Sequence, residues 1–242
     1  MRIVARTDTG LVRENNQDSY VACELEDGAV LAVVCDGMGG AAEGALASSE
    51  AVKAIKERIT ERYYGGMTDI SVKSLLVSAL EYANKHIYDL SLTDEKYEGM
   101  GTTVVAAIVS ESFAYIAHAG DSRVYLISGE NITQLTRDHS VVQRMIEKGE
   151  ITAEEAEDHP SKHIITRAMG VDCDIKVDFC QESFGEDDIL LLCSDGLTNY
   201  IETSDILNLT GDGCYYKFAD RLVNLANQNG GGDNITVVVV AQ

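Results

Sequence analysis

Residues 29–40, AVLAVVCDGMGG, join an apolar run to an aspartate and several glycines. The run 29–35 is typical of a buried β-strand, and Asp36 stands where that strand should end. A carboxylate at the end of a buried strand is costly unless a positive charge meets it. The same arrangement recurs in three more stretches: HAGDS (118–122), LLCSDG (191–196) and GGDN (231–234), the last of which leads into the apolar run 235–240.

Four aspartates therefore stand next to or near glycine at strand ends: Asp36, Asp121, Asp195 and Asp233. Hard divalent cations take carboxylate oxygens as ligands. The pattern indicates that these strand ends converge on divalent cations and that the chain is a metal-dependent catalyst.

Composition narrows the class of protein. The 242 residues are 45% hydrophobic with a single proline, which favours one folded domain over residues 1–242. The net charge of −21 disfavours nucleic acid and anionic membranes as partners. No apolar run is long enough to span a membrane and no signal peptide is visible, so we expect no membrane insertion. Six cysteines without a CxxC pair favour reduced thiols and a cytoplasmic location.

Periodicity gives a coarse map of elements. Strands are predicted up to residue 7 and over 19–25, 29–35, 102–109, 112–117, 123–127, 132–135, 175–180, 189–193 and 235–240. Helices are predicted over 43–62, 71–92, 138–148 and 215–227, the third of them capped by Asp138. Short spacers between strands favour antiparallel pairing. These elements predict a layered α/β (α+β) fold with sheet on sheet and helices outside.

One further segment and three further residues also lead to predictions. Residues 149–170 are polar and irregular and hold the only proline, so we expect a short helix and a mobile loop there. Arg123 and Ser122 are interpreted as scaffold residues. His139 is expected to pack and form hydrogen bonds rather than act as an acid or base.

A fifth motif lies near the start, DTGLVRENNQD over residues 8–18. Together with DGMGG (36–40), GTT (101–103), GDSR (120–123), SDG (194–196) and GDN (232–234), it resembles the metal-dependent protein phosphatase family, which is protein phosphatase 2C-like, and specifically its small bacterial branch. The matching elements run in family order over nearly the whole chain. The resemblance implies a central β-sandwich of two mainly antiparallel sheets flanked by helices, with a two-metal site at one end.

The resemblance also implies roles for individual residues at two Mn²⁺ or Mg²⁺ ions. Asp36 would bridge both ions, and Asp195 and Asp233 would complete the ligands of the first. The Gly37 carbonyl would bind the second ion, and Asp18 would hold metal-bound water. A hydroxide shared by the ions would then attack phosphorus in line, with no cysteine nucleophile.

Further positions follow from the same resemblance. Asp121, with Asp195, marks the place of a weaker third ion, and Arg13 would clamp the substrate phosphate. Asn234 would orient Asp233 from outside the ligand set. Met38 stands where eukaryotic relatives often carry a histidine proposed as general acid, so water should protonate the leaving group here. Residues 146–169 match the flap segment of bacterial relatives, which we expect to gate or select substrates.

The activity implied is a serine/threonine protein phosphatase acting on phosphorylated proteins, including substrates of a bacterial Ser/Thr kinase and the kinase itself, and working as a monomer. Three alternatives remain. The chain could be a metal-free pseudophosphatase that only binds, although such proteins typically lose an aspartate and this chain keeps them all. It could dephosphorylate an anti-sigma-factor antagonist. A two-metal nuclease is disfavoured by the acidic charge and by the lack of a basic run.

Overall fold

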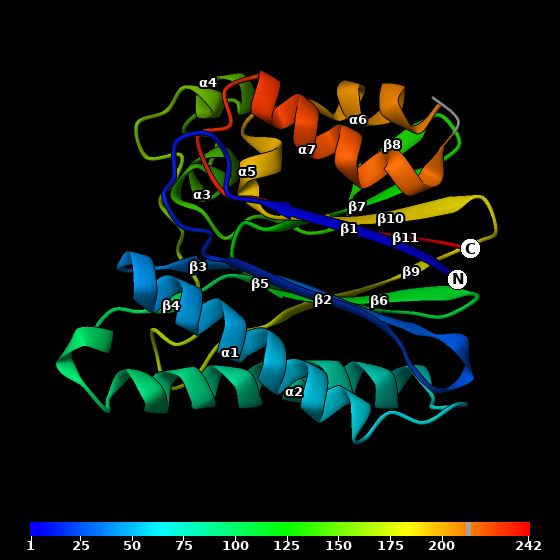
Figure 1. Ribbon diagram of the computed structural model, residues 1–242, viewed down its shortest axis with the longest axis horizontal. Helices are drawn as coiled ribbons and strands as arrows, with labels where there is room; N and C mark the ends of the chain where they lie inside the picture. Colours follow the sequence, from blue (N-terminus) through cyan, green and yellow to red (C-terminus); the bar gives the residue numbers. More distant parts are fainter. Residues whose placement is uncertain (212–213) are drawn as a thin grey trace.

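Two antiparallel sheets pack face to face in the computed structural model, which describes residues 1–211 and 214–242 (Figure 1). The first sheet has the order β1 (Arg2–Asp8), β11 (Ile235–Ala241), β10 (Asp188–Cys193), β7 (Arg123–Ser128) and β8 (Asn131–Gln134). The second has the order β2 (Asp18–Glu24), β3 (Val30–Met38), β5 (Val104–Val109), β6 (Phe113–Ala119) and β9 (Asp178–Ser183), and the short β4 (Gly101–Thr102) pairs with β3. The predicted fold class is confirmed.

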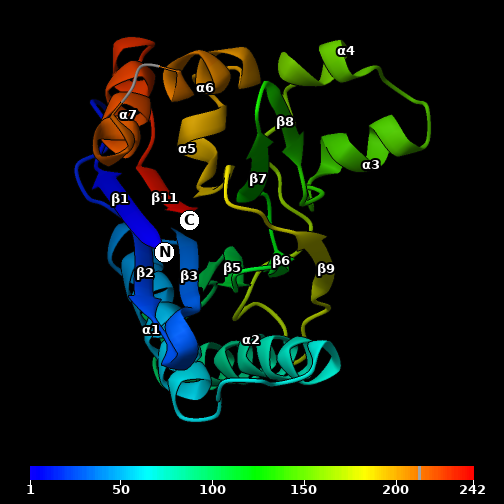
Figure 2. The ribbon, with the colours of Figure 1, turned by 90° about the vertical axis from the view of Figure 1, so that its right-hand side faces the viewer.

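Helices cover the outer face of each sheet. Helices α1 (Ala41–Thr60) and α2 (Asp69–Ser91) lie against the second sheet, while α5 (Asp195–Thr198), α6 (Thr203–Thr210) and α7 (Phe218–Gln228) cover the first (Figure 1). Helices α3 (Val141–Glu147) and α4 (Ala153–Glu157) stand apart, beyond β7 and β8 (Figure 2). Three 3-10 turns complete the described elements: η1 (Glu26–Gly28), η2 (Glu95–Tyr97) and η3 (Tyr215–Lys217).

The apolar run 29–35 is buried on both of its faces. Along β3, Leu31 and Val33 belong to the core beneath α1 and α2, whereas Val30, Ala32 and Val34 belong to the core between the sheets. Alternate residues of a strand point to opposite faces, so a strand in this position needs apolar residues throughout. Each buried valine or leucine side chain contributes about 1.5–3 kcal/mol. This double burial explains why the run is continuous rather than alternating.

The third predicted helix begins later than expected and has a different cap. Helix α3 begins at Val141, and the Ser140 hydroxyl caps it by accepting a hydrogen bond from the Gln143 amide at 3.2 Å. Asp138 is instead an ion-pair partner of Arg123, at 2.7 Å. The prediction that Asp138 caps the helix was therefore wrong, because a partner distant in sequence takes its carboxylate. Arg123 is a scaffold residue, as predicted.

Segment 149–170 contains one short helix, as expected, and the rest is turn and loop. Helix α4 starts with a capping box in which Thr152 and Glu155 exchange hydrogen bonds. Helices α5 and α6 and strand β4 were not predicted. Among the described residues, no helix combines the length and the apolar character needed to cross a bilayer.

Candidate active site

The predicted metal ligands gather at the end of the sandwich away from the chain termini (Figure 1). They surround a cavity of ≈ 450 Å³, whose walls include Asp36, Asp121, Asp195, Asp233, Arg13 and Met38. Each aspartate comes from a different segment: the end of β3, the turn between β6 and β7, the start of α5 and the turn before β11. The fold thus brings together residues that are almost 200 positions apart in sequence.

Asp18 is not one of the residues that line this cavity. The register of β2 and β3 places Asp18 opposite Asp36. Only 8% of Asp18 is exposed, and its Oδ2 accepts a hydrogen bond from the Ser194 hydroxyl at 2.7 Å. Ser194 Oγ also accepts the Thr236 amide at 2.9 Å. Ser194, which is itself bonded to β11 of the first sheet, therefore holds Asp18 in place.

The main chain around Asp36 is fixed by two neighbouring threonines. The Asp36 amide donates to Thr103 Oγ1 at 3.0 Å, and the Asp36 carbonyl accepts the Thr103 amide and the Thr102 hydroxyl, each at 2.8 Å. At Gly37 a Cβ atom would stand 2.0 Å from the Gly44 carbonyl oxygen. Only glycine allows β3 and the first turn of α1 to approach this closely.

Asp195 has one oxygen engaged by a neighbouring group, whereas Asp233 has both. Asp195 Oδ2 accepts the Asn199 side-chain amide at 3.0 Å, one turn later in α5. Asp233 Oδ1 accepts the Asn234 main-chain amide at 2.8 Å, and Asp233 Oδ2 pairs with Arg13 Nη2 at 2.8 Å. The remaining Asp195 oxygen, Oδ1, is buried and finds no hydrogen-bond partner in the described part of the chain, and the same is true of Asp18 Oδ1.

Electrostatics around the cavity favour a bound cation. Burial, together with the charges of neighbouring aspartates, raises the pKa of Asp18 and of Asp121 to about 7. Burial followed by the charges of Asp18 and Asp195 raises the pKa of Asp36 well above its usual value, and burial followed by the charge of Asp233 raises that of Asp195. Like charges gathered in a partly buried place are costly unless a cation compensates them. Carboxylates with unpartnered oxygens fit hard divalent ions.

Asn234 organises the loop that carries Arg13. The Asn234 side-chain amide donates to the carbonyls of Thr9 at 2.9 Å and Asn15 at 3.0 Å, and its Oδ1 accepts the Gln17 amide at 2.8 Å. Its contact with Asp233 is made by the main chain alone. The side chain thus acts on the loop 9–17, a function that the motif did not indicate.

Part of the predicted flap segment reaches the cavity. His163 and Ile165 line it, and a second cavity of ≈ 380 Å³ shares Met38 and Ile165 with the first. Tyr200, which follows α5, also lines the first cavity. Sequence reasoning missed Tyr200, and it gave Thr103 and Ser194 no role although both stand in the matched motifs, because single hydroxyl-bearing residues carry no spacing signal of their own.

Comparisons with known proteins agree with this geometry. The family model described as protein phosphatase 2C matches residues 12–236. Protein phosphatase PhpP of Streptococcus pneumoniae is 40% identical over 100% of this chain and 97% of its own length. The crystal structure of serine/threonine phosphatase Stp1 from Staphylococcus aureus is 35% identical and superposes with a TM-score of 0.94, covering 100% of this chain and 95% of that one.

A further solved structure bears on the metal. The catalytic domain of serine/threonine protein phosphatase PstP, in complex with two manganese ions, is 34% identical with a TM-score of 0.84 and covers 98% of this chain and 96% of that one. The matched motif residues, the shared sandwich and the full-length similarity lead to one conclusion: this chain belongs to the protein phosphatase 2C family of metal-dependent protein phosphatases.

Proposed function

We propose that this chain hydrolyses phosphoserine and phosphothreonine in proteins with the help of two divalent ions, Mn²⁺ or Mg²⁺. One observation above all supports the proposal: three carboxylates with raised pKa values line a cavity together with an arginine, and one of them, Asp195, has a buried oxygen without a hydrogen-bond partner among the described residues. In this proposal Asp36 would contribute to both ion sites, Asp195 and Asp233 would hold the first ion, and the Gly37 carbonyl would hold the second. Asp18 orients water at the same place. When bound, the ions lower the pKa of water and neutralise the phosphoryl oxygens.

The chain's own residues bind and orient the substrate. Arg13 offers a planar fork of donors that suits phosphate oxygens. The Asn234 side chain fixes the loop from which Arg13 extends. Met38 lines the cavity and has no proton to donate, so the leaving oxygen takes its proton from water. A third, weaker ion is proposed beside Asp121 and Asp195.

The cysteines near the site are poor nucleophiles. Cys35 and Cys193 each lie within two residues of a proposed ligand and are fully buried. Burial raises the pKa of the Cys193 thiol to about 12, and burial with the charges of Asp18 and Asp36 raises that of Cys35. A thiol is nucleophilic only as thiolate. These thiols therefore suit core packing, and the chemistry is assigned to water.

Partners and location belong to the same proposal. We expect the substrates to be proteins phosphorylated by a Ser/Thr kinase, and the kinase itself to be one of them. The six cysteines are free, which favours a reducing compartment such as the cytoplasm. We further propose that the chain acts as a monomer and that segment 146–169 serves as a flap within one catalytic domain spanning 1–242.

The simplest test of the proposal compares the hydrolysis of peptides that carry different phosphorylated residues. Purified protein with Mn²⁺ should release phosphate from phosphothreonine and phosphoserine peptides of one sequence, and leave the matching phosphotyrosine peptide largely intact. Equal hydrolysis of all three peptides would contradict the Ser/Thr assignment. Hydrolysis that persists in chelator would contradict the metal requirement.

A further inference from the structure

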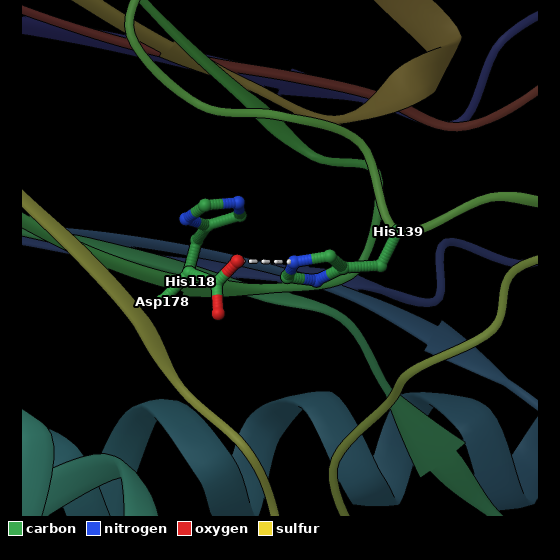
Figure 3. Close-up of side chains that lie close together, drawn as sticks. All are labelled: His118, His139 and Asp178. Atoms are coloured by element: carbon green, nitrogen blue, oxygen red, sulfur yellow. Dashed lines mark hydrogen bonds and ion pairs between the residues drawn. The ribbon is translucent and has the colours of Figure 1, made fainter. Parts of the chain in front are cut away.

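A second group of titratable side chains lies near the cavity but outside it. His118 on β6, His139 before α3 and Asp178 at the start of β9 bring one potential ligand atom each within 4.8 Å of one another (Figure 3). Two imidazoles and a carboxylate have the composition of a transition-metal site. The relative orientation of the two imidazole rings decides whether they could bind one metal ion together.

The rings are not arranged to share an ion. Their planes are parallel within 3° and their centroids are 4.7 Å apart, so they are stacked. A metal lies in the plane of each imidazole that binds it, and one ion cannot lie in two parallel, separated planes. Arg167 adds a positive charge at the carboxylate, with its Nη1 2.8 Å from Asp178 Oδ1. This group is therefore poorly suited to a cation.

Both ring nitrogens of His139 are already engaged. The Gly120 amide donates to Nδ1 at 3.0 Å, so Nδ1 carries a lone pair and the proton resides on Nε2. Nε2 faces Asp178 Oδ2 at 3.1 Å (Figure 3). Burial lowers the pKa of His139 to about 4, in keeping with a neutral ring. Burial alone would raise the pKa of Asp178, but hydrogen bonds from His139 and Arg167 lower it to about 2.

The main chain of His139 completes a junction between segments. Its amide donates to the Gly120 carbonyl at 2.9 Å, so side chain and main chain together hold both polar groups of Gly120. The His139 carbonyl accepts the Thr166 amide at 2.7 Å. His139 therefore connects the turn before Asp121, the end of the flap segment and β9, and only 7% of it is exposed.

Gly120 depends on its neighbours for a fixed position. Its φ of +122° lies in a region open mainly to glycine, and a Cβ there would stand 2.6 Å from the Cβ atom of Thr103. Glycine has the largest backbone freedom of any residue. Packing against Thr103 limits the movement of this turn on one side, and the two hydrogen bonds to His139 limit its movement on the other. Asp121 follows directly.

We propose that His139 is a positioning residue that fixes the Gly120–Asp121 turn relative to the flap segment and thereby sets the direction of the Asp121 carboxylate. The inference rests on the proposed function, in which Asp121 binds the weaker third ion. Groups that orient metal ligands from outside typically change metal affinity by 10–100-fold when they are removed. His139 acts through the main chain, so the lower end of that range applies.

Two near-isosteric substitutions separate the two contacts of the ring. In His139→Asn the side-chain oxygen occupies the place of Nδ1 and can accept the Gly120 amide, but nothing reaches Asp178. In His139→Gln the terminal amide reaches Asp178, and the Gly120 amide loses its acceptor. A general loss of packing would affect both variants alike, whereas positioning affects them differently.

Amide hydrogen exchange measured by NMR is the decisive readout. We expect the Gly120 amide to exchange at least about tenfold faster in His139→Gln and within about twofold of the unmodified chain in His139→Asn. The Ala106 amide in the central strand β5 is the internal control, because global opening exposes both amides. Equal exchange at Gly120 in the two variants would overturn the proposal.

Calorimetric titration with Mn²⁺ provides the second readout. The weakest class of sites should bind about tenfold more weakly in His139→Gln and almost normally in His139→Asn. Asp121→Asn identifies that class. If Asp121→Asn leaves the Mn²⁺ stoichiometry unchanged, the proposed role of Asp121 fails, while exchange at Gly120 still decides the role of His139.

A measurement on the unmodified chain covers the case in which a variant does not fold. The ¹⁵N chemical shifts of the His139 ring report which nitrogen carries the proton. A proton on Nε2 supports the proposal. A proton on Nδ1 would overturn it, because that nitrogen could not then accept the Gly120 amide.

Discussion

Asp195 stands at the first turn of α5, with one oxygen bonded to Asn199 and the other buried without a partner among the described residues. It is proposed as a ligand of the first ion and a neighbour of the third. Asp195→Asn should therefore reduce kcat on a phosphothreonine peptide by more than about 100-fold and weaken Mn²⁺ binding in calorimetry. Asp220→Asn, which removes the same charge from an exposed position on α7, is the control. Near-normal turnover in Asp195→Asn would refute the ligand assignment.

Arg13 is half exposed and extends from a loop fixed by Asn234. If it binds phosphate in the ground state and the transition state alike, Arg13→Ala should raise KM for a phosphopeptide while kcat changes little. A charged hydrogen bond contributes about 1.5–3 kcal/mol, so the expected increase in KM is about 10–100-fold. Arg6→Ala, a loss of charge on β1, is the matched control. An unchanged KM would argue against phosphate binding by Arg13.

Arg13 also pairs with Asp233, a proposed metal ligand. The arginine and the incoming cation therefore compete for one carboxylate. Exposed pairs contribute at most about 1 kcal/mol, so Arg13→Ala should tighten Mn²⁺ binding no more than about fivefold in the absence of substrate. Weaker Mn²⁺ binding in Arg13→Ala than in Arg6→Ala would contradict this competition.

The residues that the apolar pattern alone located are those placed at the ends of apolar runs, whereas Arg13, Asp18 and Asn234 came from the family resemblance. Asp36 and Asp195 were visible because their strands are buried on both faces and end abruptly. The contacts of Ser194 with Asp18 and of His139 with Gly120 were not visible, because they join residues from segments far apart in the chain. Such contacts depend on the tertiary fold, not on local pattern.

At the scale of elements, continuous apolar runs predicted the central strands well. The ends of elements and the short helices were predicted poorly. The predicted strand 29–35 agrees with β3 except at its end. Strand β3 continues to Met38 because β4 pairs with Gly37 and Met38. Helix α6 has only 8 residues, so it is shorter than the window of about 11–18 residues over which helical periodicity is recognised. Helix α3 was placed too early because Asp138 is a good cap by composition, yet its carboxylate binds Arg123. A local propensity yields when a distant partner offers a stronger contact.

The flap segment is anchored where it returns to the sheets, and among the described residues no isolated bridge involves α4. Isolated bridges join Ser140 to Ile165 and Thr102 to Met169. Replacing 151–158 with a Gly/Ser linker of equal length should keep these anchors. Hydrolysis of p-nitrophenyl phosphate should then stay within about twofold, while the ratio of rates on two different phosphopeptides should change by more than about threefold. Unchanged ratios across several peptides would refute a role in substrate selection.

The whole molecule carries a net charge of −21, and part of that charge is concentrated in one partly buried site. Asp18 and Asp121 have pKa values raised to about 7, above the usual 3.8. A raised carboxyl pKa gives stability at low pH that is lost as pH rises through 7. In EDTA the free energy of unfolding should therefore fall by about 1 kcal/mol between pH 6.5 and pH 8, which lowers Tm by about 2–4 °C.

The pH window begins at the usual histidine pKa of 6.5, and burial lowers the pKa of His139 and of His118. These two rings therefore gain stability as pH rises and offset part of the loss from the two aspartates, which is included in the expected net fall. Saturating Mn²⁺ should remove the fall in Tm, because bound ions stabilise the ionised carboxylates. Thermal unfolding followed by circular dichroism measures both conditions. A Tm in EDTA that stays level or rises from pH 6.5 to pH 8 would contradict the proposed charge repulsion.

The central claim is that these aspartates hold the ions needed for phosphate hydrolysis. The most direct test strips the protein with EDTA, removes the chelator, and follows release of phosphate from a phosphothreonine peptide as Mn²⁺, Mg²⁺ or Ca²⁺ is added back. We predict that Mn²⁺ or Mg²⁺ restores activity in parallel with calorimetric metal binding, and that in Asp195→Asn metal binding is weaker and the restored activity is more than about 100-fold lower. A folded protein that binds these ions and stays inactive with every one of them would contradict the account.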